Sequence, residues 1–136
     1  MTYKIEAIEG VGPFFAERLH TVGVHSTDDL LTRCGTDLRR REVAAALGIS
    51  PMMLTLWTRQ ADLMRIRGVG AEYGQLLAHA GVESVAHLAT YEPDVLARGL
   101  ARANAERKLV RVLPSSRMVA RWVREAAELA PQRPLA

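Results

Sequence analysis

The chain has 136 residues, of which 49% are apolar and 24% are charged. This is ordinary globular composition, and it excludes an intrinsically disordered chain. No apolar run reaches the roughly 18 residues that cross a membrane, and the N-terminal MTYKIEAIEG lacks a signal-peptide pattern, so we expect a cytoplasmic protein. The single cysteine, Cys34, excludes an internal disulfide and a thiolate metal cluster.

The net charge is +3, and the basic excess lies in the second half of the chain. Residues 1–65 carry 8 basic and 8 acidic side chains, whereas residues 66–136 carry 10 and 7. One stretch combines a single acid, Glu106, with eight basic residues: Arg98, Arg102, Arg107, Lys108, Arg111, Arg117, Arg121 and Arg124. A local excess of this kind favours an anionic partner.

Two stretches of the sequence follow the same pattern. IEGVGPFFAERL begins at Ile8 and IRGVGAEYGQLL begins at Ile66, and nine of 24 positions are identical between residues 8–31 and 66–89. These positions are turn glycines, caps and apolar residues, which a repeated structural unit retains. Later the offset changes from 58 to 65 residues, which places Trp57 against Trp122. The change predicts a seven-residue insertion in the second copy, within residues 91–113.

The first copy begins with two predicted helices. Pro13 suits the first position of a helix, and apolar residues follow it at helical spacing. Gly23 is a natural left-handed stop for this helix. Ser26 or Thr27 is then expected to cap the next helix, because a side-chain oxygen at that position accepts from a free backbone N–H group.

The first copy continues with two further helices. One of them is predicted to run through RRREVAAAL and to end at Gly48, and Ser50 with Pro51 opens a last helix that reaches about Arg65. The charged stretch DLRRRE, residues 37–42, is predicted to be a solvated turn. Trp57 and its counterpart Trp122 are both expected in the core, because each lies on the apolar side of an amphipathic helix.

The second copy repeats this organisation, with Gly81 as a stop, Ser84 as a cap and Pro114–Ser115 at the start of the last helix. No segment alternates like a half-buried strand, so the fold class is predicted to be all-α. We expect one unit over residues 1–65, a second over 66–130, and a disordered tail at 131–136.

The repeated Gly-Val-Gly turn has a physical role between two helices. Glycine allows a positive φ and a close approach of neighbouring atoms, while the central valine turns inward. The helix that follows starts with free N–H groups, which together with the helix dipole form an anion site. A nucleic-acid phosphate is the expected ligand for the two turns, Gly10–Val11–Gly12 and Gly68–Val69–Gly70.

These residues resemble a known superfamily. IEGVGPFFAERLHTVGVHSTDDLL followed by AAALGISPMMLTLWTRQADL is similar to the tandem helix-hairpin-helix domain of archaeal recombinases and DNA-repair nucleases. The chain also looks like a bacterial family built from two such units, with the resemblance extending over about residues 5–130. It implies two SAM-like units of about five short helices each, packed as one compact body.

The sequence departs from DNA-binding members of that superfamily at both turns. Those members usually place Lys or Arg two residues after the second glycine, where this chain has Phe14 and Glu72. Glu9 precedes the first turn, whereas Arg67 precedes the second. The residue types therefore favour the second turn over the first as a phosphate site, and Phe14 becomes a candidate for protein interaction.

Three arginines of the last predicted helix lie on one face. Arg117, Arg121 and Arg124 occupy positions i, i+4 and i+7, opposite apolar partners such as Trp122. This face is either a stripe that follows phosphates or an ordinary solvated helix surface. The candidate nucleic-acid residues are the two turns together with Arg67, Arg102, Arg107, Lys108, Arg111, Arg117, Arg121 and Arg124.

The sequence carries no arrangement of residues typical of an enzyme. There is no Ser-His-Asp pattern, no phosphate-binding loop of the nucleotide hydrolases and no metal-ligand spacing, so we expect no catalytic activity, no metal and no cofactor. Two hypotheses remain, namely sequence-independent binding of DNA or RNA, and a protein-interaction module in which Phe14 docks a partner. A solvent-facing Phe14 within an apolar patch would favour the second hypothesis, and a Phe14 buried between the two copies would remove that support.

Overall fold

The computed structural model describes residues 2–129, and their regular structure is helical. An isolated bridge joins Lys4 to Ser26. The predicted all-α fold class is confirmed, while the predicted disordered tail lies outside the described residues. The elements are η1 (Ile5–Ala7), α1 (Gly12–His20), α2 (Thr27–Arg33), α3 (Asp37–Leu47), α4 (Pro51–Leu63), α5 (Ala71–His79), α6 (Val85–Leu88), α7 (Pro93–Arg107) and α8 (Ser116–Leu129).

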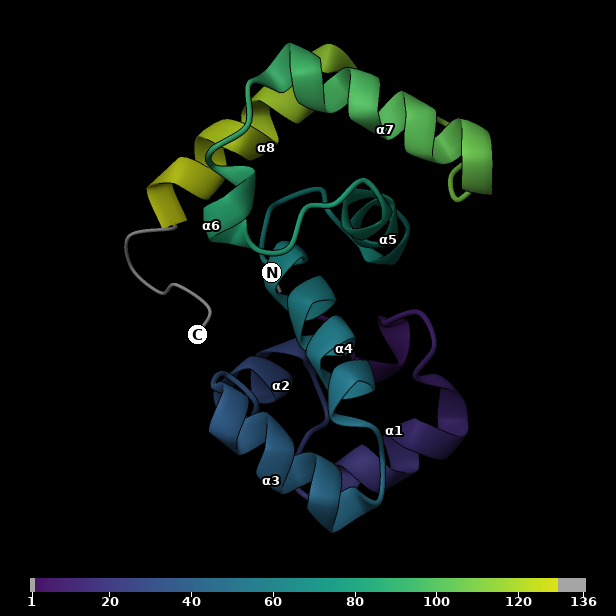
Figure 1. The fold of residues 1–136 in the computed structure, drawn as a ribbon, viewed down its shortest axis with the longest axis vertical. Coiled ribbons are helices and arrows are strands. Elements are labelled where there is room, and N and C mark those ends of the chain that lie inside the picture. The colour runs from purple at the N-terminus through teal and green to yellow at the C-terminus, as the bar shows by residue number, and fades with distance from the viewer. Residues whose placement is uncertain (1, 130–136) are drawn as a thin grey trace.

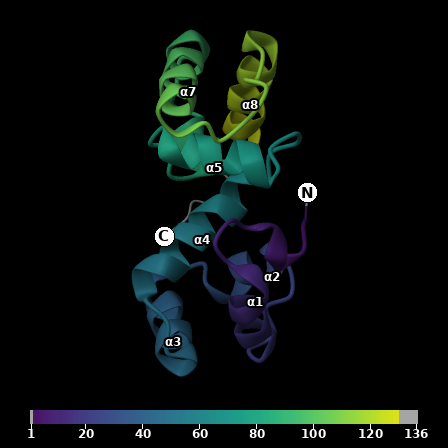
Figure 2. The same cartoon turned by 90° about the vertical axis from the view of Figure 1, so that its right-hand side faces the viewer.

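Helix α4 runs along the long axis and links two groups of helices (Figure 1). Helices α2 and α3 pack against α4 at one end, and α5 packs against it at the other. Helices α7 and α8 lie side by side above α5 in the turned view (Figure 2). Within the described residues, no helix has the length and apolar character needed to cross a membrane.

Two hydrophobic clusters form the core, and the end of α4 contributes to both. Ala61 and Met64 belong to the cluster of the first half, whereas Leu63 and Ile66 belong to that of the second half. Trp57 is buried in the first cluster and Trp122 in the second. The prediction that both tryptophans are core residues is therefore confirmed.

Side-chain caps begin most of the α-helices. Ser26 accepts from the Asp29 N–H group at 3.0 Å, and Ser84 accepts from the His87 N–H group at 3.0 Å. Both caps were predicted, because serine at this position satisfies a backbone donor that has no partner inside the helix. The remaining caps are Thr36 for α3, Ser50 for α4, Glu92 for α7 and Ser115 for α8.

Two local predictions need correction. Residues 37–42 are the first half of α3 and not a turn, and the helix predicted through RRREVAAAL is confirmed for residues 39–42. Thr36 caps this helix, and Arg40 is only 7% exposed and donates to the Cys34 carbonyl at 2.9 Å. Helix α4 ends at Leu63, before the predicted Arg65. The helix gives way there to a tighter turn, in which the Arg65 N–H group donates to the carbonyl of Asp62, three residues earlier.

The inserted residues of the second copy lie in two places. Helix α7 has 15 residues against 11 in α3. The connection that follows it spans residues 108–115, whereas residues 48–50 suffice in the first copy. Most of the extra length thus falls in the predicted range of residues 91–113, and it lengthens one helix and one loop without changing the order of elements.

The lone cysteine is a packing residue. Cys34 is fully buried at the end of α2, and burial raises the pKa of its thiol to about 11. Because the nucleophilic form is the thiolate, this thiol stays protonated and inert at neutral pH.

Candidate nucleic-acid interface

The first glycine of each turn has the same conformation in both copies. Gly10 has φ +91° and Gly68 has φ +88°, which are values that residues with a side chain rarely adopt. A Cβ at Gly10 would lie 3.5 Å from Nε1 of Trp57, and one at Gly68 would lie 3.5 Å from Nε1 of Trp122. Each turn therefore packs closely on the tryptophan of the last helix of its own copy.

The central valines of the two turns are alike, whereas the second glycines differ in conformation. Val11 and Val69 are buried, as predicted. Gly12 has φ +58°, whereas Gly70 is extended, with φ −94° and ψ −158°. The difference follows from Pro13, because a residue before proline is kept out of the right-handed helical region and glycine is free to take a positive φ.

The helices that follow the two turns have no side-chain cap. Among the α-helices of residues 2–129, α1 and α5 are the two whose first N–H groups receive no oxygen from an N-cap side chain. The cap position is Val11 in α1 and Gly70 in α5, and neither side chain offers an acceptor. These N–H groups and the helix dipole together leave a partial positive charge at each turn.

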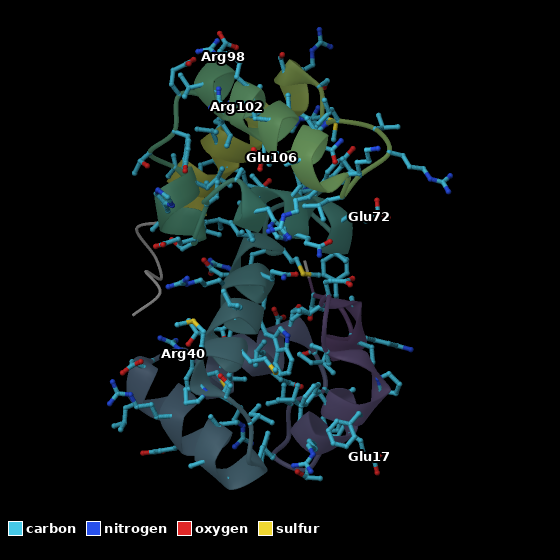
Figure 3. All side chains as sticks on the ribbon, turned by 45° about the vertical axis from the view of Figure 1, so that its right-hand side comes forward. Glu17, Arg40, Glu72, Arg98, Arg102 and Glu106 are labelled. Atoms are coloured by element: carbon cyan, nitrogen blue, oxygen red, sulfur yellow. The ribbon has the colours of Figure 1, made fainter. Side chains whose placement is uncertain are left out.

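Carboxylates surround the first turn. Gly12 and Pro13 share a shallow depression with Glu6, Glu17 and His20. The carboxylate of Glu6 lies 3.9 Å from Nε2 of His20, and Glu17 is exposed on α1 (Figure 3). Carboxylates that line the same depression as Gly12 repel a phosphate, so they make the first turn a less favourable anion site.

The second turn is joined to the basic helix α8. The backbone N–H group of Arg67 donates to both carboxylate oxygens of Glu125, at 3.1 and 3.3 Å, while the Arg67 side chain is exposed. Arg121 and Arg117 precede Glu125 by one and two turns on the same side of α8. The exposed arginine face of α8 therefore begins beside the second turn.

Helix α8 separates its basic and apolar sides as predicted. Arg117, Arg121 and Arg124 are all exposed. On the opposite side the helix buries Val119, Trp122 and Ala126. The remaining basic residues of the predicted interface, on α7 and in the connection after it, are exposed as well: Arg102, Arg107, Lys108 and Arg111.

The connection between α7 and α8 lies against the start of α5. The hydroxyl of Tyr73 donates to the carbonyl of Val112 at 2.9 Å, and Tyr73 belongs to the first turn of α5. The contact brings the segment that carries Arg111 next to the uncapped helix. Glu72, in the same first turn, is exposed and adds a negative charge at this point (Figure 3).

Helix α7 carries another part of the predicted interface. Figure 3 shows Arg98, Arg102 and Glu106 in sequence along α7. Their spacing of four residues places them on one side of that helix. The structure thus gathers Arg67, the second turn, Arg111 and the α8 arginines around the start of α5, whereas Arg102 extends the basic surface along α7.

Phe14 is exposed, at 62% of its surface. Its ring lies 5.1 Å from that of Phe15, and the Arg18 guanidinium lies 4.9 Å above it. Arg18 also donates to the Leu47 carbonyl at 2.5 Å, which ties α1 to the end of α3. Phe14 therefore faces solvent, which is one part of the condition for a docking residue.

Three residues of this region escaped prediction from the sequence: Tyr73, Asn104 and Glu125. Each acts through a hydrogen bond to a backbone group distant in sequence, and periodicity does not reveal such a bond. The repeat offers no signal for Glu125 either, because the offset of 65 residues in the last helix pairs it with Gln60.

Comparison with known proteins identifies the family. The domain of unknown function DUF4332 matches residues 9–129, which include both turns and α8. The chain belongs to the DUF4332 family. No curated protein and no solved structure matches this DUF4332 chain. Family membership therefore covers both copies of the repeat and assigns no activity to them.

Proposed function

We propose that this DUF4332 chain is a non-enzymatic module that binds the nucleic-acid backbone without reading sequence. In this proposal the chain consists of two tandem helix-hairpin-helix units, residues 1–65 and 66–130, and the second unit provides the main contact. The first turn of α5 receives a phosphate on its free N–H groups, and the α8 arginines contact phosphates further along the backbone.

The hydrogen bond between the Arg67 N–H group and Glu125 carries this proposal. It holds the second turn against α8, so that a fixed group of backbone donors and a row of exposed arginines belong to one surface. The acidic surroundings of the first turn assign it a structural role in this proposal.

Binding measurements at two salt concentrations test the proposal. Fluorescence anisotropy with a duplex, a single strand and a four-way junction should give affinities that fall steeply between about 50 and 200 mM salt, because bound phosphates release counterions. Reversing charge in Arg117→Glu with Arg121→Glu should weaken binding about tenfold or more and lower the salt slope by about 2. Glu72→Lys should strengthen binding, because it removes a repulsive charge beside the phosphate site.

The matched control reverses two exposed arginines of the first half. Arg33→Glu with Arg41→Glu changes the net charge by the same amount away from the proposed surface, and should leave the affinity within about twofold of the parent. The proposal fails if the parent chain binds none of the three probes at about 50 mM salt. It also fails if both double variants lose the same affinity.

A protein-interaction role is the second candidate, and the exposure of Phe14 favours it. Phe15 joins Phe14 to Trp57 through ring contacts of 5.1 and 5.3 Å. Trp57 in turn borders a cleft of about 380 Å³ between the two halves, which further apolar side chains line: Met53, Leu56, Ala78 and Val82. A photo-crosslinking phenylalanine analogue at position 14 should then trap one defined protein in cells, and the same analogue at position 95 should not.

A further inference from the structure

The connection between α7 and α8 exposes two apolar side chains at its tip. Val112 is 72% exposed and Leu113 is 43% exposed. The first copy has no equivalent, because its connection consists only of residues 48–50. The apolar tip therefore belongs to the insertion of the second copy, which is also the half with the basic excess.

Hydrogen bonds at Val110 and at Val112 hold the first part of this tip in place. The Asn104 side chain donates to the Val110 carbonyl at 3.1 Å and accepts from the Val110 N–H group at 2.9 Å. Val110 is buried, and Tyr73 binds the Val112 carbonyl at 2.9 Å. The backbone is thus fixed directly before Val112 and at Val112 itself, so the exposure of this side chain does not result from a loose loop.

Lys108 shows that the loop keeps a costly conformation. With φ +52° it is the non-glycine residue with positive φ among residues 2–129, at the position where the first copy has Gly48. A lysine there is strained, and such strain persists only where the surroundings over-determine the backbone. The Asn104 hydrogen bonds to Val110 provide that constraint directly after Lys108.

The sequence on either side of the tip carries only positive charges. From Arg107 to Arg124 the sequence has six basic residues and no acidic one. Arg111 directly precedes the tip, and the uncapped start of α5 lies beside it through Tyr73. The surface thus combines two apolar side chains with groups that attract phosphates on both sides, and Glu72 at the start of α5 is the acidic residue beside them.

We propose that Val112 and Leu113 act as a wedge that enters an interrupted base stack, such as a gap or a nick. Inserted aliphatic side chains are a known means of exploiting unstacked or kinked steps. Arg111 and Arg117 would hold the phosphates on either side of the step. This inference rests on the proposed nucleic-acid binding and specifies the kind of nucleic acid that is preferred.

An anionic membrane is the competing partner for a basic surface with an apolar tip. The two side chains together contain fewer carbons than a myristoyl chain, which by itself gives only marginal membrane binding. The free N–H groups of α5, adjacent to the tip, suit a phosphate at close range. These two points favour nucleic acid, and the vesicle arm of the experiment tests the alternative.

The experiment compares an intact duplex with the same duplex carrying a one-nucleotide gap, with 2-aminopurine next to the gap. The parent chain should bind the gapped duplex about tenfold more tightly, and 2-aminopurine fluorescence should rise as the base leaves the stack. Val112→Ser with Leu113→Ser should remove both effects, because the polar side chains gain nothing from the stack. Val95→Ser, at a residue that is 48% exposed on α7, is the matched control and should keep both effects.

The outcomes separate this inference from the proposed function. If the parent chain binds neither duplex, the proposed function fails and the wedge fails with it. If the parent binds both duplexes equally, with no fluorescence change and no effect of the Val112/Leu113 double variant, the wedge is wrong and backbone binding stands. If the double variant instead loses binding to vesicles of phosphatidylserine and phosphatidylcholine, while the fluorescence never changes, the tip contacts membranes and the wedge is overturned.

Discussion

At the scale of single residues, the turn glycines are fixed by conformation and not by lack of space. A Cβ at Gly10 or Gly68 would meet the tryptophan at an ordinary contact distance of 3.5 Å, but both residues have φ near +90°. The left-handed region is costly for any residue with a side chain. The turn has room for a Cβ atom at these two positions, but the backbone conformation disfavours any residue that carries one.

Alanine substitutions test this distinction. Gly10→Ala and Gly68→Ala should each lower the free energy of unfolding by about 1–2 kcal/mol, because alanine is strained at positive φ. Gly99→Ala in α7 should raise it by about 0.5–1 kcal/mol, because glycine weakens a helix interior and a Cβ at Gly99 meets nothing within 4 Å. Urea denaturation of the three variants measures these values. Equal effects at all three positions would contradict the conformational explanation.

At the scale of elements, a buried carboxylate of α4 positions the short helix α6. Asp62 is 3% exposed; its carboxylate accepts from the Val85 N–H group at 2.7 Å and pairs with Arg65 at 2.7 Å. In the first copy the equivalent N–H group, that of Thr27, donates to the Tyr3 carbonyl instead. In the second half, the Asp62 side chain thus has the acceptor role that the Tyr3 backbone carbonyl has in the first half.

Removing this carboxylate should destabilise the whole chain. Asp62→Ala should lower the free energy of unfolding by about 3 kcal/mol, because a buried ion pair loses one partner and a buried N–H group loses its acceptor. Arg41→Ala, which breaks the exposed pair with Asp37, should cost no more than about 0.5 kcal/mol. Chemical denaturation monitored by circular dichroism gives both values. A loss below about 1 kcal/mol in Asp62→Ala would show that the pair is not a structural link.

At the scale of the whole molecule, the end of α4 ties the two clusters together. Neighbouring residues of this segment alternate between the clusters, with Leu63 in one and Met64 in the other. Neither cluster is complete without α4, and Asp62 adds a polar link across the same boundary. We therefore expect the two halves to unfold as one cooperative unit, although the sequence divides into two copies.

The two tryptophans report on the clusters separately. Trp57→Phe leaves only Trp122 to report on the second cluster, and Trp122→Phe leaves only Trp57 to report on the first. In each variant the fluorescence transition in urea should coincide with the transition of the helical circular dichroism signal. Fluorescence and dichroism midpoints that separate in either variant would mean that the halves unfold independently.

The sequence by itself determined the class, the repeat and most helix boundaries of this chain. These features follow from local rules: apolar spacing marks the helices, serine caps begin them, and the turn glycines recur at a fixed offset. The change of offset between the two copies also located the insertion. The helical period located the apolar and basic sides of α8, because it sets which residues share one side of a helix. It misjudged residues 37–42, since a charge count does not reveal that the Thr36 cap starts a helix or that Arg40 is buried within it.

Only the tertiary structure decided which turn adjoins the basic surface and what holds it there. The residues next to the two Gly-Val-Gly turns already favour the second turn, but only the structure shows that Gly12 of the first turn shares a depression with Glu6 and Glu17. It also shows that Glu125 joins the second turn to α8. The exposed tip at Val112, which Tyr73 and Asn104 hold in place, could not be predicted from the sequence either. Each of these features depends on side chains and backbone groups that are distant along the chain, and only the packing of helices on both sides of α4 brings them together.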